Sequence, residues 1–176
     1  MSITRFLIRL FAALLATPLS LLATRAEAGQ EYPSVVVDVA VWQDQGKVVK
    51  GAARGHELRI DQPTVYGGSD TAATPPETFA FALGACLVSS LRFIAELENT
   101  KISNIRARVV GNLNFSRVMG GAGRAGFLGL TLYASFDAPW DEGQKMSFLR
   151  RVSERCPIYD NVLQETSMRL VLDKGE

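Results

Sequence analysis

One long apolar helix limits what this chain can fold into. Residues 74–77 (Thr-Pro-Pro-Glu) combine a threonine N-cap, a proline at the first helical position and a glutamate three residues after the cap, the pattern of a helix start closed by a capping box. The helix is predicted over residues 75–98. Its centre, residues 79–88, is apolar on every face, which predicts burial on all sides. Charged residues toward its end argue against a membrane span.

Strand patterns lie on both sides of this helix. β-Branched and alternating residues, separated by turn signals, predict an antiparallel meander before it and two long strands after it. Two shorter helices and a last strand complete the chain. The predicted strands cover residues 35–42, 47–51, 56–60, 102–116, 127–137 and 168–172, and the predicted shorter helices cover residues 140–155 and 158–165. Strands and helices in this order define one α+β domain, which we expect over residues 29–176.

The first segment of the chain is predicted to be a secretory signal peptide, residues 1–28. Arg5 and Arg9 precede an apolar stretch, residues 10–23, and a small-residue cleavage site follows at Ala26-Glu27-Ala28, as is typical of such peptides. An uncleaved N-terminal anchor is the alternative. We therefore expect a periplasmic or secreted protein, with no stable membrane insertion after cleavage.

Composition excludes several classes of function. Among 176 residues, 47% are hydrophobic and 21% are charged, which excludes general disorder. A net charge of +1 gives no support for nucleic-acid binding. One histidine and two cysteines do not supply a zinc site, so we expect no metal and no cofactor. The histidine, His56, is predicted to be structural. Residues 119–126 are rich in glycine, as phosphate-binding loops are. A phosphate-binding loop precedes a helix, whereas these residues precede a strand pattern, so we do not expect them to bind phosphate.

The two cysteines are the remaining candidates for chemistry. Cys86 and Cys156 lie 70 residues apart, so they do not form a Cys-x-x-Cys motif. They are buried and inert, or they form a structural disulfide, or they are a catalytic pair in which one thiolate attacks an oxidant and the other resolves the sulfenic acid. The catalytic alternative needs a nearby cation. The candidate cations are Arg54, Arg59, Arg92 and Arg155.

Three parts of the chain carry motifs of one known protein family. Residues 67–70, 74–77 and 82–86 form a helix motif that ends in a cysteine, residues 156–162 (Cys-Pro-Ile-Tyr-Asp-Asn-Val) form a second-cysteine motif, and residues 54–63 form the hairpin that enters the first motif. In these motifs and their order the chain resembles the OsmC/Ohr family, the osmotically inducible protein C and organic hydroperoxide resistance proteins. The resemblance spans residues 35–172.

This resemblance implies antiparallel sheets packed around a long central helix in an intertwined homodimer. It also implies thiol-dependent reduction of organic hydroperoxides in oxidative stress defence, with a dithiol as the reductant. By position, Cys86 is the peroxidatic residue and Cys156 the resolving residue. Glu77 matches the glutamate that pairs with an active-site arginine, for which Arg54 is the best match.

Alternatives remain open at the level of residues and of function. Glu77 lies nine residues before Cys86, so it need not face the same way and is alternatively only the acid of the capping box. Four apolar side chains are either a wall for an alkyl tail or plain core: Phe79, Phe81, Leu83 and Phe93. The alternative function is a non-catalytic protein that binds an apolar small molecule at the dimer interface, with structural cysteines. General disulfide exchange is a third.

Overall fold

The computed structural model describes residues 32–173. The chain divides into two compact units, Met1–Val37 and Asp38–Glu176. In the first unit, the described residues 32–37 form neither helix nor strand. All helices and strands of the described residues lie in the second unit. The predicted signal peptide, residues 1–28, lies outside the described residues.

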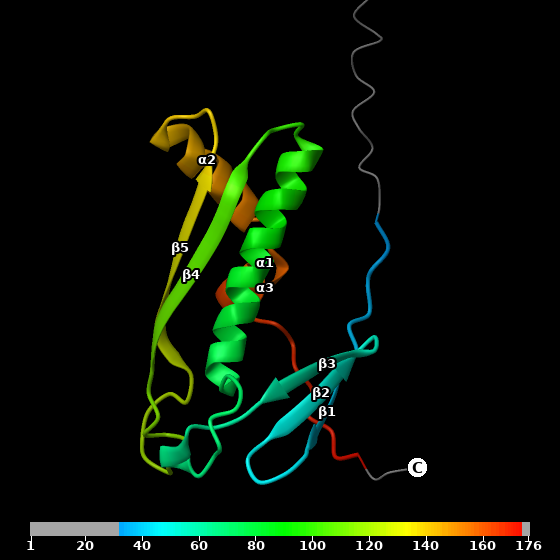
Figure 1. The fold of residues 1–176 in the computed structure, drawn as a ribbon, viewed down its shortest axis with the longest axis vertical. Helices are drawn as coiled ribbons and strands as arrows, with labels where there is room; N and C mark the ends of the chain where they lie inside the picture. The colour runs from blue at the N-terminus through cyan, green and yellow to red at the C-terminus, as the bar shows by residue number, and fades with distance from the viewer. Residues whose placement is uncertain (1–31, 174–176) are drawn as a thin grey trace, which may run out of the picture. The chain divides into compact units, whose positions relative to one another are not determined.

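The predicted meander is an antiparallel sheet of order β1-β2-β3 (Figure 1). It consists of β1 (Ala40–Gln43), β2 (Val49–Ala53) and β3 (His56–Ile60). The first strand begins at Ala40, whereas the sequence pattern predicts a start at residue 35. Ala40 pairs with Ala52, one residue before β2 ends and the chain turns into β3. Past Ala53 the chain turns into β3, so Asp38 has no residue of β2 opposite it.

The long helix is α1 (Pro75–Leu97), and its predicted start is confirmed. The Thr74 side chain accepts a hydrogen bond from the Glu77 N–H (3.4 Å), and the Glu77 carboxylate accepts one from the Thr74 N–H (2.8 Å). The expectation of burial on every face is wrong for the single chain, because Phe81 is 74% exposed and Phe93 is 62% exposed. Only one face of the helix meets other elements of its own chain.

That inner face packs against a second sheet. The strands β4 (Ser103–Leu113) and β5 (Phe127–Asp137) pair antiparallel, as predicted, and α1 runs alongside β4 (Figure 1). Gly84 permits this close approach, since a Cβ atom there would lie 3.3 Å from Val109 Cγ2.

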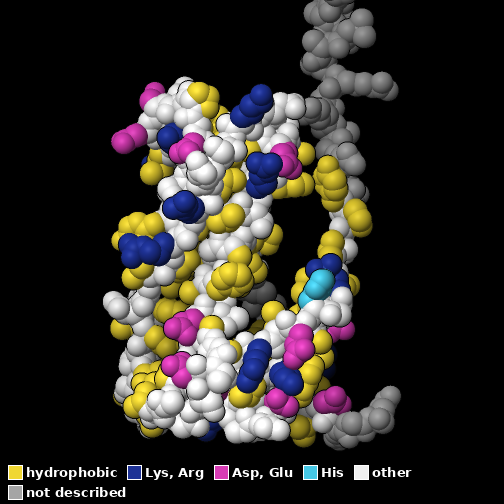
Figure 2. All heavy atoms as spheres, in the orientation of Figure 1, with side chains coloured by type: hydrophobic (Ala, Val, Ile, Leu, Met, Phe, Trp, Pro, Cys, Tyr) yellow, Lys and Arg dark blue, Asp and Glu magenta, His cyan; other side chains and the backbone are white. Residues whose placement is uncertain are grey.

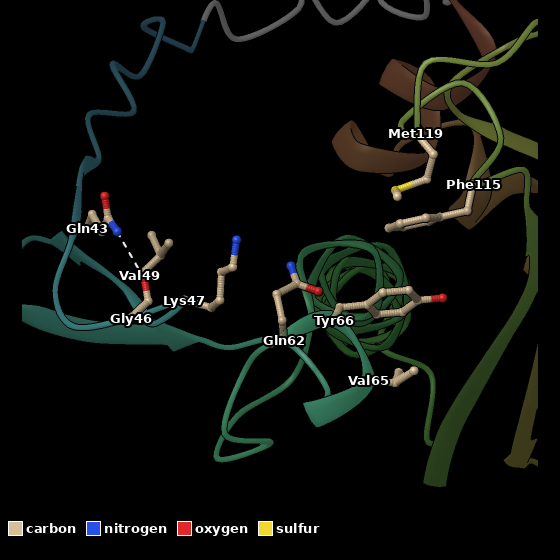
Figure 3. Close-up of a pocket in the computed structure, with 10 residues that line it drawn as sticks. Gln43, Gly46, Lys47, Val49, Gln62, Val65, Tyr66, Phe115 and Met119 are labelled. Atoms are coloured by element: carbon tan, nitrogen blue, oxygen red, sulfur yellow. Dashed lines mark hydrogen bonds between the residues drawn. The ribbon is translucent and has the colours of Figure 1, made fainter.

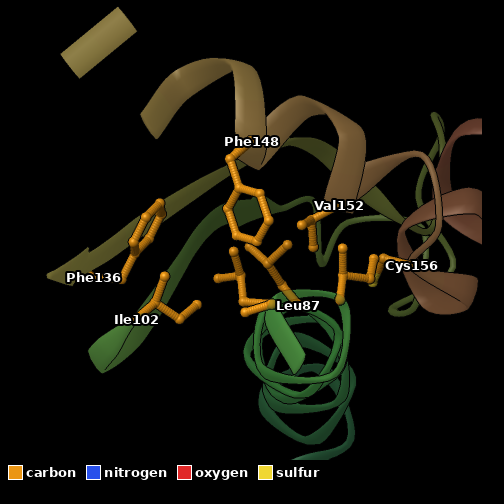
Figure 4. Packing of buried hydrophobic residues seen from close by; sticks show 9 residues of the cluster. Leu87, Ile102, Phe136, Phe148, Val152 and Cys156 are labelled. Atoms are coloured by element: carbon orange, nitrogen blue, oxygen red, sulfur yellow. The ribbon is translucent and has the colours of Figure 1, made fainter. Parts of the chain in front are cut away.

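Two further helices pack against α1 and complete the buried core. α2 (Glu142–Ser153) and α3 (Pro157–Leu163) contact α1, and both were predicted. Phe148 and Val152 of α2 and Cys156 face Leu87 of α1 in the buried cluster (Figure 4).

The predicted last strand is wrong. Residues 168–172 have no regular structure, and their apolar side chains are exposed. Neither sheet of the described chain has a strand paired with this segment. A β-branched or alternating pattern does not by itself form a strand, because the backbone of a strand needs a partner for its hydrogen bonds.

Among the described residues, α1 is long and apolar enough to cross a membrane by length and composition. The core helix of a soluble protein meets the same criterion. Arg92 and Glu96 form an ion pair on its exposed side (2.7 Å), and its inner face carries the core of the unit. We therefore describe α1 as the central helix of an α+β fold.

Candidate active site

The fold brings the two cysteines together. Cys86 lies in the middle of α1, and Cys156 is the residue before α3. Both are free thiols, and the Cys156 thiol donates a hydrogen bond to Cys86 Sγ at an Sγ–Sγ distance of 3.1 Å. A disulfide bond is about 2.05 Å long, so a shift of about 1 Å would join the two sulfur atoms.

Local sequence explains why Cys156 points inward. Pro157 starts α3, and Cys156 stands before it as the N-cap in an extended conformation (φ −93°, ψ 108°). From there its side chain enters the core beside Leu87 and Val152 (Figure 4). Cys156 is 0% exposed, whereas Cys86 is half-buried. A reagent from solvent therefore reaches Cys86 before it reaches Cys156.

The surroundings of Cys156 shift its acidity in both directions. Burial raises the pKa of the Cys156 thiol, and the hydrogen bond with Cys86 raises it further. The backbone N–H of Tyr159 and the hydroxyl of Ser90 lower the pKa, because both donate hydrogen bonds that favour the thiolate. The net direction of the pKa shift is upward, which favours the protonated form of Cys156, the donor of the hydrogen bond to Cys86 Sγ.

Glu77 stands apart from the cysteines within one chain. Nine residues of α-helix are two and a half turns, about 13.5 Å of rise, so Glu77 and Cys86 leave opposite faces of α1. Hydrogen bonds from the backbone and the hydroxyl of Thr74 lower the pKa of Glu77. The described chain therefore gives Glu77 its capping role and does not bring it to Cys86.

The candidate arginines are spread over the chain. Arg92 pairs with Glu96 (2.7 Å), and Arg59 donates to Thr71 Oγ1 (3.1 Å). Arg54 occupies the turn between β2 and β3 with a positive φ of 50°, and its side chain is exposed. Arg155 directly precedes Cys156 and is also exposed.

An apolar groove opens on the face of α1 that carries Cys86. It has a volume of about 580 Å³ and lies between the start of α1, the start of β5 and the end of α3. Phe79 of α1 and Phe127 of β5 stack across it with ring centroids 5.8 Å apart. Phe79 precedes Cys86 by seven residues, about two turns, so the two side chains share one face. Of the predicted apolar wall, Phe79 lines this groove and Leu83 belongs to the core.

A second groove runs between α1 and β4, on the side of α1 away from Cys86. Its volume is about 520 Å³, and Phe81, Ala85 and Val88 line it together with Glu77. Figure 2 shows hydrophobic side chains gathered on the molecular surface over α1. This groove exposes apolar side chains on a central helix, and no element of the described chain covers it.

A third cavity lies away from the cysteines. It measures about 760 Å³ and is formed by the β1–β2 turn region, the short helix η3 (Thr64–Tyr66) and the β4–β5 loop (Figure 3). Tyr66 and Phe115 stack there with centroids 5.0 Å apart. Neither cysteine and no residue of α1 or α3 lines this cavity, so it is separate from the candidate active site.

Sequence reasoning missed three contributors to the site. Ser90 carries a readable signal, since it follows Cys86 by four residues, one turn of the same helix. Phe127 and the N–H of Tyr159 carry none, because their place depends on how β5 and α3 pack on α1. In residues 32–173, no group of three or more His, Cys, Asp or Glu side chains could hold a metal ion.

The chain combines an α+β fold with two contacting thiols, one on the central helix and one buried beneath it. Comparisons with known proteins specify the class to which it belongs. The family model of OsmC-like proteins matches residues 67–171. The chain belongs to the OsmC-like protein family. A comparison with curated proteins gave no match.

Solved structures show the same fold at low sequence identity. An OsmC-like protein from Mycoplasma pneumoniae is similar with a TM-score of 0.66 at 16% identity, covering 76% of this chain and 91% of that one. An organic hydroperoxide resistance protein from Legionella pneumophila gives 0.58 at 20% identity, covering 76% and 93%. One from Vibrio cholerae, solved with captopril in one of its active sites, gives 0.56 at 19%, covering 77% and 90%. The predicted family and fold are thereby confirmed.

Proposed function

We propose that this protein is a thiol-dependent peroxidase that reduces organic hydroperoxides. The observation that carries the proposal is the 3.1 Å contact between Cys86 Sγ and Cys156 Sγ in the reduced state. Two free thiols this close, one half-buried and one fully buried, are arranged for sequential oxidation of the outer thiol and attack by the inner one.

The reaction has two steps on the protein. The Cys86 thiolate attacks the terminal, hydrogen-bearing oxygen of the hydroperoxide. An S–O bond forms, the O–O bond breaks, and the alkoxide leaves and takes up a proton to become the alcohol. Cys86 is then a sulfenic acid. Cys156 attacks its sulfur, the S–O bond breaks, and water leaves as the disulfide forms. A dithiol reductant returns both cysteines to thiols, and it attacks Cys86 because Cys156 is 0% exposed.

The groove beside Phe79 supports an organic rather than an inorganic peroxide. It is lined largely by apolar side chains, and neither cysteine is among them. Phe79 in its wall leaves α1 on the same face as Cys86, about two turns away, so an alkyl or aryl tail that extends from a peroxide at Cys86 along this face would exchange water for aromatic contacts. The names of relatives from Legionella pneumophila and Vibrio cholerae point the same way, since both are called organic hydroperoxide resistance proteins.

The exposed face of α1 supports a homodimer. Phe81 and its neighbours form an apolar groove on the central helix, and such a surface is covered in a stable protein. We propose that a second copy covers it, and that Glu77 meets an arginine, Arg54 by the family resemblance, only in the dimer. Residues 1–28 support a location outside the cytoplasm.

Rapid-mixing kinetics test the proposal. Reduced protein is mixed with cumene hydroperoxide or with hydrogen peroxide, and the remaining oxidant is measured. We expect faster consumption of cumene hydroperoxide, loss of the reaction in Cys86→Ser, and a single turnover followed by overoxidation in Cys156→Ser. Consumption no faster than by free cysteine would reject the peroxidase and favour the alternatives, binding of an apolar small molecule or disulfide exchange.

A further inference from the structure

The cavity away from the two cysteines has the size of a small-molecule site. It measures about 760 Å³ and is formed by the β1–β2 turn, the segment around η3 and the β4–β5 loop (Figure 3). Pockets of roughly 300–1,000 Å³ are typical of sites for small ligands. All of its lining residues belong to the unit Asp38–Glu176, and none of them lines either groove along α1. The cavity is therefore a separate place in the fold.

One side of this cavity is aromatic and open to solvent. The rings of Tyr66 and Phe115 stack with centroids 5.0 Å apart and an interplanar angle of 22°. Tyr66 is 50% exposed, and Met119, which lies beside the pair, is 74% exposed. Val49 lies across the cavity from them (Figure 3). A stacked aromatic pair with solvent-exposed surface offers an apolar ring or chain a place to pack.

The Lys47 side chain stands between Val49 and this aromatic pair (Figure 3). Its stem passes the glycine that ends η3, because a Cβ atom at Gly67 would lie 3.9 Å from Lys47 Cε. In the part of the chain that the structure describes, the ion pairs join other side chains and none includes Lys47. Its ammonium group is exposed and therefore available to an anion from outside the chain.

Gln62 stands beside Lys47 in the same view (Figure 3), and its backbone holds it in place. The Gln62 N–H donates to Asp61 Oδ1 (2.8 Å), and the Gln62 carbonyl accepts from the Asp70 N–H (3.1 Å). Within residues 32–173, the half-buried side-chain amide of Gln62 makes no hydrogen bond. Its donors are therefore open to a ligand in the cavity.

Charge selects the class of ligand. Lys47 is the charged side chain among the described residues that line the cavity, and no carboxylate lines it there. The acidic residue of the same turn, Asp44, pairs with Lys50 instead (3.2 Å). A cation and an amide next to an aromatic surface suit a ligand with an anionic group and an apolar body.

We propose that this cavity binds a small organic acid in its anionic form. The apolar body of the acid packs on Tyr66 and Phe115, and its carboxylate or sulfonate group accepts hydrogen bonds from the Lys47 ammonium group and the Gln62 amide. The site is distinct from the two thiols, so the inference does not depend on the reduction of hydroperoxides.

Two fluorescent probes test the site on the reduced protein. Anilinonaphthalene sulfonate is an aromatic anion, and phenylnaphthylamine has the same rings without the sulfonate. Both fluoresce when their rings leave water, so a titration gives a dissociation constant for each. The open grooves along α1 also accept apolar rings, and the neutral probe measures that background. The ratio of the two dissociation constants therefore reports on the cation.

For Lys47→Gln we expect binding of the sulfonate probe to weaken about fivefold and binding of the neutral probe to stay unchanged, because a charge-assisted hydrogen bond is lost and the rings still pack. Tyr66→Ala should weaken both probes. Lys101→Gln is the matched control, since Lys101 is exposed and precedes β4, whereas Phe115 follows that strand. It should change neither dissociation constant. Lys47 is exposed, so Lys47→Gln decides the test even if Tyr66→Ala fails to fold.

Two results would overturn the inference. One is an unchanged ratio of dissociation constants in Lys47→Gln, which would place the bound anion elsewhere. The other is a Tyr66→Ala protein that binds both probes as wild type does but sediments as a monomer where wild type is a dimer. A second copy of the chain, rather than a small anion, would then occupy the cavity.

Discussion

The two faces of α1 differ in what covers them. The inner face buries Leu87 and Leu91 against β4, α2 and α3 and brings Cys156 to Cys86. The outer face carries Phe81 and Glu77 on an open apolar groove. One helix thus contributes a pair of thiols in contact within the chain and an open apolar surface. Under the proposed function, the two sulfur atoms react within one chain, and a second copy covers the open surface.

The largest effect is expected inside the closed face. Leu91 is 0% exposed, so Leu91→Ala leaves a cavity and lowers the free energy of unfolding by about 2–5 kcal/mol. Leu97 lies on the same helix with its side chain exposed, and Leu97→Ala is expected to change it by less than about 0.5 kcal/mol. Urea unfolding measures both. Equal losses would contradict the burial of Leu91 in the core.

The next effect concerns the loop that leads into α1. Asp61 is buried and accepts hydrogen bonds from the backbone of Thr71, Gln62 and Ser69 and from the Thr71 hydroxyl. These hydrogen bonds lower the pKa of Asp61 from 3.8 to about 2, and the backbone N–H groups of Thr71 and Gln62 have the largest effects. The carboxylate therefore stabilises the fold fully above pH 3.8, and this contribution is lost as the pH falls through about 2.

Asp61→Asn replaces an all-acceptor group by an amide that also donates, so we expect a lower melting temperature at pH 7. The difference from wild type should shrink as the pH falls from 4 toward 2, because the wild-type carboxylate is then protonated as well. Asp70→Asn, at an exposed position in the same loop, is the control. A constant difference across this pH range would contradict the assignment.

The open face is tested by adding a charge. Phe81→Glu places a carboxylate in the apolar groove and should weaken the proposed dimer by about 2 kcal/mol, a factor of roughly 30 in Kd. Val118→Glu, at an exposed apolar position in the β4–β5 loop, should leave the dimer intact. Sedimentation gives the mass of each. A monomeric wild type would remove the proposal of a second copy on this face.

The smallest effect separates two roles of Glu77. Glutamine also closes a capping box, so Glu77→Gln should change the free energy of unfolding by less than about 1 kcal/mol. If Glu77 also pairs with an arginine in the dimer, as we propose, peroxide reduction falls by about tenfold, the factor that corresponds to about 1.4 kcal/mol. An unchanged rate would confine Glu77 to capping.

The same division explains what could be read from the sequence. The capping box predicts the start of α1 because Thr74 and Glu77 are three residues apart and hydrogen-bond to each other. The strand patterns predict β4 and β5, and these two strands pair with each other in the fold. The segment at 168–172 has the same kind of pattern and forms no strand, since pairing is not local.

For the site, the family motifs predict the two cysteines, and only the packing of α3 on α1 shows that their sulfur atoms meet. The groove beside Phe79 needs Phe127, which is 48 residues away in the chain. Arg54 is exposed in the β2–β3 turn of the single chain, so its proposed pairing with Glu77 is a prediction about the dimer.

Cys86 and Cys156, whose sulfur atoms are in contact, are proposed to form a redox pair within one chain. The most direct test is the intact mass of the reduced protein, under non-reducing conditions, after one equivalent of cumene hydroperoxide. We predict a single chain lighter by two hydrogen atoms, with both thiols lost. Digestion of the oxidised protein should then give a pair of peptides joined by a disulfide between Cys86 and Cys156. Unchanged thiols, or a disulfide between two chains, would contradict a redox pair within one chain.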